Sequence, residues 1–548
     1  MKKQILCIVA LLIWFSSVAF PKADQNSPSS EPKASTTNAA KDSSIAPPGK
    51  LMVPPLALDD TSITVIWEKP ADYSNVVSYK VYQNGSLAGT TKNLFYTIAG
   101  LEPNSPYSIT VKSVDASGNE SQPGNKVVQS TAPAMKVFDV TKYGAIGDGN
   151  TLNTKAIQKA IDECTAGGKV LVPAGTFLSG ALFLKSDMTI QIDGTLMGSD
   201  DINEYPMTNL RFPYYLSGKG YMGLINAYTE KYGSLTNIKI CGKGNMCGGK
   251  WDGGKNTVLG IKEAAVSNND SGRSDLITAK GINNLYIGGL TFTNPAMHVI
   301  MITYSKNVTV TGITANTFDI HNADGIDLAT SDTAYIFNST FDTGDDCINF
   351  NAGVGADGVK ENFPDQNIRV FNCLTKRGHG GVVFGSFTAA WIQNVLVEDC
   401  IFDGTEIGLR FKTNESNGGG ARNVLCRDIT IKNTIKDSAI FFDSAYTHTP
   451  SGYPSGGPGQ FKDITIKNIT CENLKKYGIW ISGLPKMPHT NINISNVTIN
   501  GGKAGGAAIK SATNCKFENI TIKNSTPVWI IDPNSTSGLE FKNCDPKP

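Results

Sequence analysis

A tetrapeptide that mostly begins with Asn and continues with strand-forming residues recurs through the second half of the chain. Its copies start at residues 284, 307, 334, 367, 394, 423, 463, 491 and 514, at intervals of 23, 27, 33, 27, 29, 40, 28 and 23 residues. Such intervals, with β-branched residues in the strands and Asn or Gly at the corners, are typical of a β-solenoid. The repeat predicts a right-handed parallel β-helix whose apolar side chains stack from coil to coil.

Residues 51–133 follow a different pattern, in which apolar and polar residues alternate as in half-buried strands. Turn signals such as Asn84-Gly85 separate the alternating segments. Tyr107 lies four residues after Pro103, at the spacing of a tyrosine corner, in which the hydroxyl bonds to backbone upstream. The segment resembles a fibronectin type III module, which is a β-sandwich. We interpret it as a spacer, and a sugar-binding or cell-surface-binding module is the alternative. The expected strands are 62–67, 78–82, 95–98 and 108–114.

The N-terminus has the pattern of an export signal. Two lysines precede an apolar run from Ile5 to Trp14, and Ser17-Val18-Ala19 offers a cleavage site. The run is too short to span a bilayer comfortably, so a retained anchor is the less favoured interpretation. We predict a signal peptide over residues 1–23 and a disordered linker, rich in Ser, Pro and Ala, over residues 24–50. The mature chain is expected to be secreted or periplasmic.

The remaining residues, 134–548, are assigned to the β-helix domain. One segment near its start, Thr154–Cys164, has helical spacing, with Ile157, Ala160 and Ile161 on one face. A β-helix exposes strand edges and core at its open end unless another element covers them. The sequence therefore predicts that this helix caps the solenoid. The longest stretches between repeats, such as 356–366 and 446–460, are expected to form loops that build the walls of a site.

Composition excludes several classes of protein. A net charge of +1 over 548 residues argues against binding to nucleic acid through bulk charge. No segment after the signal is apolar enough to span a membrane. Ten cysteines follow the signal, and export permits disulfides, but spacing does not assign them. The pairs to check are Cys241 with Cys247 and Cys515 with Cys544. No Cys-x-x-Cys occurs, so we predict no metal and no other cofactor, and we expect a monomer.

Four heptapeptides in the middle of the repeat region place acids and bases at matching positions. When they are stacked, their apolar residues align, Asp324 is level with Asp346, and Asp345 is level with His379. Their starts are 22, 34 and 27 residues apart, as expected for successive coils. The polar residues should therefore form one patch on one face of the solenoid. The heptapeptides are Asn322–Leu328, Gly344–Phe350, Gly378–Phe384 and Thr405–Phe411, and Lys412 follows the last.

This patch combines carboxylates with cations. Neighbouring strands lie about 4.8 Å apart, so three Asp residues on two coils repel one another and the pKa of at least one rises. A protonated carboxyl beside an ionised one suits the two-carboxylate chemistry of glycoside hydrolysis. Arg410 and Lys412 point to the same side and suggest an anionic sugar as substrate. Alone, an Asp-Asp pair is more often a solvated turn or a calcium ligand. Four polar elements in phase favour catalysis.

The four signatures, Asn322-Ala-Asp324, Gly344-Asp345-Asp346, Gly378-His379-Gly380 and Arg410-Phe-Lys412, resemble those of the polygalacturonase family, glycoside hydrolase family 28. The resemblance covers residues 137–544 and implies hydrolysis of α-1,4 bonds between galacturonates, with inversion. It implies that Asp345 protonates the leaving oxygen, that Asp324 and Asp346 position the attacking water, and that His379 supports the acid. Arg410, Lys412 and Asn322 would bind the substrate. The family also has a tyrosine on a following coil, and Tyr446 is our candidate.

Two positions depart from the family pattern. Ala323 stands where Thr is usual, and its side chain should point away from Asp324. Phe411 stands where Ile or Leu is usual, at a position expected to face the core. We predict that both changes are tolerated.

Several interpretations of function remain open. Long inserted loops and the type III module favour an exo-acting polygalacturonase that releases mono- or digalacturonate from polygalacturonate or oligogalacturonides. An endo-acting enzyme is the alternative. A calcium-dependent pectate lyase would also need carboxylates and an Arg or Lys base, although the Gly-His-Gly stretch argues against it. A non-catalytic β-helix adhesin would have no reason to place acids and cations on four consecutive coils.

Overall fold

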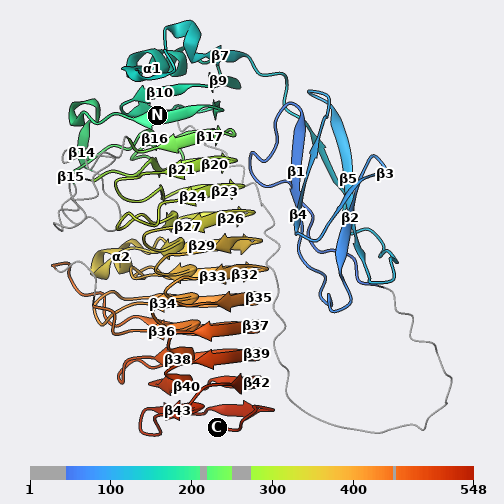
Figure 1. Cartoon of the computed structure of the whole chain (residues 1–548), viewed down its shortest axis with the longest axis vertical. Coiled ribbons are helices and arrows are strands. Elements are labelled where there is room, and N and C mark those ends of the chain that lie inside the picture. Colours follow the sequence, from blue (N-terminus) through green and yellow to red (C-terminus); the bar gives the residue numbers. More distant parts are fainter. Residues whose placement is uncertain (1–44, 210–218, 250–272, 448–451) are drawn as a thin grey trace, which may run out of the picture. The chain divides into compact units, whose positions relative to one another are not determined.

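The computed structural model describes residues 45–209, 219–249, 273–447 and 452–548. The predicted signal peptide and most of the predicted linker lie outside the described residues. Within the described ranges, no helix is long and apolar enough to cross a membrane. Parallel strands stack as successive coils of a β-helix, and a β-sandwich precedes them in the chain (Figure 1). The predicted fold class is confirmed, while the domain boundaries stay predictions.

Two large parallel sheets form the β-helix, one of 12 strands and one of 25. The smaller sheet carries the predicted site. It consists of β11 (Leu182–Phe183), β16 (Ile225–Tyr228), β19 (Ile277–Lys280), β22 (Ile300–Thr303), β25 (Ile326–Ala329), β28 (Ile348–Asn351), β31 (Val382–Phe384), β34 (Leu409–Lys412), β36 (Ile440–Asp443), β38 (Tyr477–Ser482), β40 (Gly505–Lys510) and β43 (Trp529–Ile531). The larger sheet consists of β7 (Val137–Asp139), β8 (Asp148–Leu152), β9 (Gly168–Val172), β10 (Thr176–Ser179), β12 (Met188–Ile192), β13 (Thr195–Gly198), β17 (Leu235–Cys241), β18 (Asn245–Cys247), β20 (Ile282–Gly288), β21 (Thr291–Thr293), β23 (Lys306–Thr311), β24 (Thr314–Asn316), β26 (Asp332–Phe337), β27 (Thr340–Asp342), β29 (Asp365–Phe371), β30 (Leu374–Thr375), β32 (Ile392–Glu398), β33 (Ile401–Asp403), β35 (Gly420–Lys432), β37 (Gln460–Leu474), β39 (His489–Gly502), β41 (Ala512–Thr513), β42 (Lys516–Lys523), β44 (Thr536–Ser537) and β45 (Glu540–Lys542).

The repeat found in the sequence corresponds to successive strands of the larger sheet, with one error of phase. Val308 pairs with Ala334, so Thr333, and not Ala334, is equivalent to Asn307. The backbone is left-handed at this corner, with φ of 58° at Asn307 and 63° at Thr333. Asn tolerates that conformation well and a β-branched residue does not, so Thr was not expected there.

Asn side chains also join one coil to the next. Nδ2 of Asn394 donates to Oδ1 of Asn367 at 3.0 Å, and Nδ2 of Asn423 donates to Oδ1 of Asn394 at 2.7 Å. Asn is suited to such a ladder because its amide both donates and accepts a hydrogen bond. The same residue type therefore supplies the corner conformation and a coil-to-coil bond.

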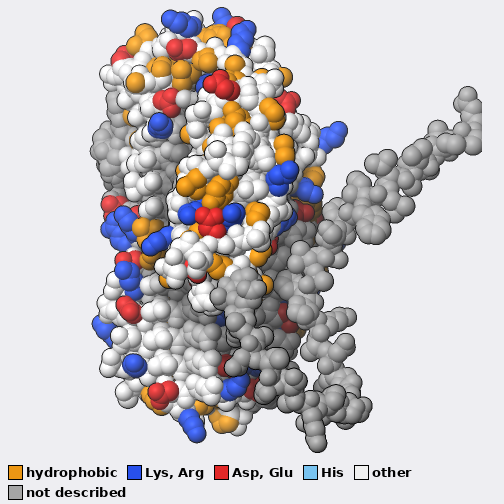
Figure 2. Space-filling model, turned by 90° about the vertical axis from the view of Figure 1, so that its right-hand side faces the viewer, with side chains coloured by type: hydrophobic (Ala, Val, Ile, Leu, Met, Phe, Trp, Pro, Cys, Tyr) orange, Lys and Arg blue, Asp and Glu red, His pale blue; other side chains and the backbone are white. Residues whose placement is uncertain are grey.

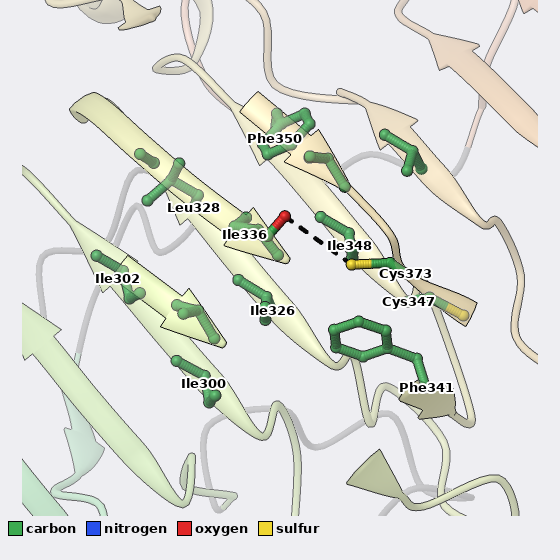
Figure 3. Close-up of a cluster of buried hydrophobic side chains, with 14 of the residues drawn as sticks. Ile300, Ile302, Ile326, Leu328, Ile336, Phe341, Cys347, Ile348, Phe350 and Cys373 are labelled. Atoms are coloured by element: carbon green, nitrogen blue, oxygen red, sulfur yellow. Dashed lines mark hydrogen bonds between the residues drawn. The ribbon is translucent and has the colours of Figure 1, made fainter. Parts of the chain in front are cut away.

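The core consists of columns of apolar side chains that repeat from coil to coil (Figure 3). Further along the axis, Phe384, Phe411 and Phe442 form an aromatic stack, with ring centroids 4.2 and 4.3 Å apart. Phe411 is completely buried in this stack, which explains how an aromatic residue fits a position where the family pattern has Ile or Leu. Two of the columns in Figure 3 are Ile300, Ile326 and Ile348, and Ile302, Leu328 and Phe350.

Helix α1 (Thr154–Glu163) buries Ile157, Ala160 and Ile161 at the N-terminal end of the β-helix, the end at which a cap was expected (Figure 1). Helix α2 (Gly355–Glu361) occupies the predicted insertion at 356–366. Part of the predicted loop at 446–460, residues 448–451, lies outside the described residues, as do residues 210–218 and 250–272. The remaining short elements are η1 (Val140–Tyr143), η2 (Ile202–Glu204), β14 (Met207–Asn209) and β15 (Lys219–Tyr221).

The β-sandwich has a two-stranded and a four-stranded antiparallel sheet. The four predicted strands are present, and the sequence pattern missed β3 and β6, in which no residue is fully buried. The tyrosine corner is confirmed, because the hydroxyl of Tyr107 accepts a hydrogen bond from the backbone N–H of Glu102 at 2.9 Å. The strands are β1 (Ser62–Ile66), β2 (Ser78–Gln83), β3 (Ser86–Thr91), β4 (Phe95–Ala99), β5 (Pro106–Val114) and β6 (Val127–Ser130).

Residues of the sandwich also bond to the β-helix. Nη2 of Arg369 donates to the carbonyl oxygen of Trp67 at 2.7 Å, and Nζ of Lys69 lies 2.6 Å from one oxygen each of Asp399 and Asp428. Phe337 and Phe371, which project from β26 and β29, share one buried apolar cluster with the sandwich. These contacts favour a structural part for the module over that of a loose spacer.

The ten cysteines of the described residues are free thiols, and all except Cys241 are buried. The two suggested pairs, Cys241 with Cys247 and Cys515 with Cys544, are therefore not disulfides in this structure. In Figure 3, Cys373 lies among the apolar side chains of the core, and its thiol donates a weak hydrogen bond to the carbonyl oxygen of Ile336.

Charged side chains of both signs are interspersed on the face drawn in Figure 2. This mixture agrees with the net charge of +1.

Candidate active site

All the predicted site residues of the four heptapeptides come together at strands β25, β28, β31 and β34. The register is the one expected, because Ile326 pairs with Ile348, Ile348 with Val382, and Val382 with Leu409. Asp324, Asp345 and Asp346 each place a carboxylate oxygen within 4.8 Å of the other two. The polar face thus follows from strand pairing, since residues of equal phase become neighbours.

Asp345 is held by three hydrogen bonds. Its Oδ1 lies 2.7 Å from Nδ1 of His379 and accepts the backbone N–H of Asp346 at 2.9 Å. Its Oδ2 accepts Nδ2 of Asn322 at 3.2 Å. Nε2 of His379 lies 3.8 Å from a carboxylate oxygen of Glu406. The carboxyl group of Asp345 is therefore fixed in position and shares a short bond with a titratable partner.

Asp346 is neutralised by the two predicted cations. Its Oδ2 accepts Nζ of Lys412 at 2.7 Å, and its Oδ1 accepts Nη1 of Arg410 at 3.2 Å. The ring of Tyr446 lies beside both cations, with its centroid 5.1 Å from Nζ of Lys412 and 5.5 Å from Cζ of Arg410. The two cations and the tyrosine thus form one edge of the carboxylate cluster.

Two glycines of the signatures are required by close backbone packing. A Cβ at Gly344 would overlap the carbonyl oxygen of Ile320. Gly378 has φ of 149°, and a Cβ there would lie 2.7 Å from the carbonyl oxygen of Asp345. Only glycine brings these chain segments close enough to crowd the acids together.

Asp324 and Asp345 differ in how readily they ionise. Burial raises the pKa of Asp324 well above its usual range, and the charges of Asp327, Asp345 and Asp346 raise it further. Burial also opposes the ionisation of Asp345, but the hydrogen bond and charge of His379, with Lys412 and Arg410, outweigh it and hold the pKa of Asp345 well below its usual range.

The pKa of His379 shifts in the opposite direction to that of Asp345. Burial lowers its pKa, but the hydrogen bond to Asp345 and the negative charges of Asp345, Asp346 and Glu406 raise it above 6.5. The pair of His379 and Asp345 therefore holds one proton near neutral pH, and in the free site that proton resides on the imidazole. The sequence predicted that the pKa of at least one carboxyl group would rise. That carboxyl group belongs to Asp324, and not to Asp345, which the resemblance assigns as the acid.

The column of polar residues that precede the strands of the smaller sheet, which includes Asp324 and Asp346, extends two coils further than the four heptapeptides. Asp275 and His298 precede β19 and β22 by two residues, as Asp324 and Asp346 precede β25 and β28. Arg273 donates through Nη2 to Oδ1 of Asn322 at 2.8 Å. The signal was present, because the apolar strand residues that follow Asp275 and His298 have the same phase as those of the heptapeptides. It was missed because neither segment contains a Gly-bounded signature.

Among the described residues, two groups of side chains are close enough to hold a cation. One is the trio of Asp324, Asp345 and Asp346, and the other is His298 with Asp324 and Asp327. In the first group, Arg410 and Lys412 already supply positive charge to Asp346. The arrangement suits proton transfer beside an anionic ligand, because it combines a proton shared by His379 and Asp345 with two fixed cations.

Comparison with known proteins assigns families to both parts of the chain. The sequence model of glycosyl hydrolases family 28 matches residues 164–525, about two thirds of the chain. The model of the fibronectin type III domain matches residues 46–130. The predicted resemblances to both families are confirmed.

Individual relatives cover most of the chain. An exo-poly-alpha-D-galacturonosidase of Dickeya chrysanthemi is 35% identical, over 87% of this chain and 90% of its own length. The structure of the family 28 exopolygalacturonase of Yersinia enterocolitica superposes with a TM-score of 0.82 at 32% identity, over 92% of this chain and all of that one. An exopolygalacturonase of Thermotoga maritima shares the fold, with a TM-score of 0.61 at 24% identity, over 72% of this chain and 93% of that one.

Proposed function

Because this chain belongs to glycosyl hydrolase family 28 and is a glycoside hydrolase, we propose that it degrades pectin by hydrolysing α-1,4 bonds of polygalacturonate. The observation that carries the proposal is the cluster of three carboxylates bordered by Arg410 and Lys412. Carboxylates supply acid and base for cleavage of a glycosidic bond. The two cations favour a sugar that itself bears a carboxylate, as galacturonate does. We propose further that the protein is exported and that it acts as a monomer on polygalacturonate or oligogalacturonides.

Asp345 is the proposed general acid, and His379 is its proton donor. When a sugar covers the site and displaces water, the low dielectric favours a neutral pair over an imidazolium–carboxylate pair. The proton then moves from Nδ1 of His379 across 2.7 Å to Oδ1 of Asp345, and from the carboxyl group to the glycosidic oxygen. In this way the low pKa of Asp345 in the free site is compatible with its role as acid.

Asp324 and Asp346 are the proposed pair that holds the attacking water. A water molecule that bonds to two carboxylates at about 2.7 Å each fits between oxygens up to roughly 5 Å apart. The oxygens of these two residues lie within 4.8 Å. Lys412 and Arg410 donate to Asp346 and are placed to bind the carboxylate of a galacturonate, with the ring of Tyr446 beside them. Asn322, which donates to Asp345, is proposed to bind the substrate from the other side of the acid.

Inversion is proposed from membership of the family. The spacing of the three carboxylates is smaller than the 6.5–9.5 Å usual for inverting enzymes, so geometry alone would not suggest it. The anomer released first, observed by proton NMR before mutarotation, tests this step. The β-anomer is expected, and release of the α-anomer would show retention.

Exo-action is proposed because the relatives from Dickeya and Yersinia are named as exo-acting enzymes and cover most of both chains. We expect polygalacturonate to yield only saturated mono- or digalacturonate from the earliest time point, and EDTA to leave the rate unchanged. Chromatography of early samples, with detection at 235 nm for unsaturated products, is the measurement. A ladder of oligomers would indicate endo-action, and unsaturated products that EDTA abolishes would indicate a pectate lyase.

The dependence of activity on pH should report the shared proton of His379 and Asp345. Because the pKa of His379 is raised above 6.5, the pair keeps its proton below that value and loses it as the pH rises. We expect kcat/KM to fall on the alkaline side above pH 6.5. In His379→Gln, Asp345 must hold the proton alone. The alkaline limb of the pH profile of kcat/KM should therefore move to lower pH by one unit or more. An unchanged limb in the variant would show that the imidazole does not supply the proton.

A further inference from the structure

A second histidine lies on the other side of the carboxylate cluster from His379. His298 occupies the column position between Asp275 and Asp324, two residues before β22. Its Nδ1 lies 3.0 Å from Oδ1 of Asp275. Its Nε2 therefore points away from Asp275, and lies 4.0 Å from Oδ1 of Asp324 and 3.9 Å from Oδ2 of Asp327. The bond to Asp275 fixes the orientation of the ring.

The surroundings of His298 contain little water. The exposed fractions are 8% for His298, 6% for Asp275, 5% for Asp324 and 2% for Asp327. Oδ1 of Asp327 accepts Nδ2 of Asn349 at 3.0 Å, whereas Oδ2 is buried and has no hydrogen-bond partner among the described residues. A buried carboxylate oxygen without a donor needs a nearby positive charge. The imidazole of His298 is the titratable base that faces this oxygen.

We infer that His298, held by Asp275, is a positioning residue that balances the charge of Asp327 and so allows Asp324 to ionise and take up the proton of the attacking water. The inference rests on the proposed function, because it takes Asp324 as a member of the water-holding pair. It explains why a buried histidine lies among carboxylates at the base of the site. The charged and titratable groups that face His298 are Arg273, Asp275, Asp324 and Asp327, and those that face Asp324 further along the column are Asp345, Asp346 and Lys412.

The electrostatic shifts agree with this geometry. Burial raises the pKa of Asp324, and Asp327 is the nearby charge that raises it most. Burial likewise raises the pKa of Asp327, and His298 is the group that most opposes this rise. The pKa of His298 is itself raised, because Asp327 and Asp275 outweigh the effect of burial. A protonated His298, 4.0 Å from Asp324, and an ionised Asp327 should therefore act on Asp324 with opposite signs.

The opposite signs give a test that a purely structural role would not pass. In His298→Gln a positive charge is lost, so the pKa of Asp324 should rise and the acidic limb of kcat/KM should move to higher pH by about one unit. In Asp327→Asn a negative charge is lost, so the same limb should move to lower pH. The double variant should return the limb towards the wild-type position. The alkaline limb, which His379 controls, should stay in place in all three.

His489 provides a matched control. It is fully buried in β39, where the backbone N–H of Phe461 donates to its Nδ1 at 3.2 Å, and burial lowers its pKa to about 3. His489→Gln removes a buried imidazole of similar exposure, and neither limb should move. The inference would be overturned if the acidic limb of kcat/KM stayed in place in His298→Gln and Asp327→Asn. It would also be overturned if that limb moved in the same direction in both variants.

A measurement without substrate separates this inference from the proposed function. The chain has five histidines, so the Cε1 signals of protein labelled with ¹³C-histidine can be assigned by single substitutions. We expect His298 to titrate above pH 6.5 in the wild type and at lower pH in Asp327→Asn. If this shift is seen in a protein that does not cleave polygalacturonate, the proposed function fails and the charge pair stands. If His298 titrates alike in both proteins, the inference fails whatever the activity.

Discussion

Asp345→Asn is expected to slow the hydrolysis of polygalacturonate by about 10²–10⁴-fold, the usual contribution of a general acid. The same variant should retain most of its activity on α-galacturonosyl fluoride, because fluoride leaves without a proton. Asparagine keeps the shape of the side chain and still accepts a hydrogen bond, so the fold should be unaffected. Initial rates on both substrates, with folding checked by circular dichroism, are the measurement.

Asp324→Asn should behave differently, because activation of water is needed for either leaving group. We expect it to lose activity on polygalacturonate and on the fluoride alike. Asp403→Asn is a suitable control, since its carboxylate lies on β33 of the other sheet, where it pairs with Lys432 and Asn433. If Asp345→Asn loses the fluoride reaction and Asp324→Asn retains it, the roles of acid and base must be exchanged. The raised pKa of Asp324 makes that exchange the specific alternative.

Lys69→Met is expected to lower the free energy of unfolding by about 2–3 kcal/mol, because it removes a buried cation that is shared by two partly buried carboxylates. Nζ of Lys69 lies 2.6 Å from oxygens of both Asp399 and Asp428, and its side chain is only 9% exposed. The hydroxyl of Tyr73 donates to Asp428 at 3.2 Å, so the ion pair belongs to a larger polar contact between the module and the β-helix. Urea denaturation and the rate of proteolysis at the module would measure the loss.

Lys80→Met is the matched control for this prediction. Lys80 bonds to Glu120 at 2.8 Å, but both side chains are about a quarter to a third exposed and belong to the module itself. Exposed pairs contribute less than about 1 kcal/mol. Equal destabilisation by the two variants would show that the contact with the β-helix does not stabilise the protein. Below the unfolding transition, both variants should keep wild-type kcat, since neither residue lies near the carboxylates.

The site was predictable to the extent that it repeats. In a parallel β-helix, residues of equal phase become neighbours at about 4.8 Å, so alignment of four heptapeptides was enough to bring Asp324, Asp345, Asp346 and His379 together. Arg410 and Lys412 followed from alternation along one strand. The same rule would have found Asp275 and His298, but their coils lack the glycines that marked the others. The one error of phase, at Thr333, arose because a β-branched residue occupies a left-handed corner that Asn usually fills.

Periodicity and short motifs were enough to predict the solenoid, the type III module, the family, and which acids and cations cluster together. The tertiary structure alone decided which carboxyl group is the harder to ionise. That depends on burial and on partners such as His379 and Asp327, whose distances no periodicity fixes. It also decided that Lys69 and Arg369 join the module to the β-helix, since these contacts link residues about 300 positions apart. Such contacts arise from packing of side chains, and packing leaves no regular trace in a sequence.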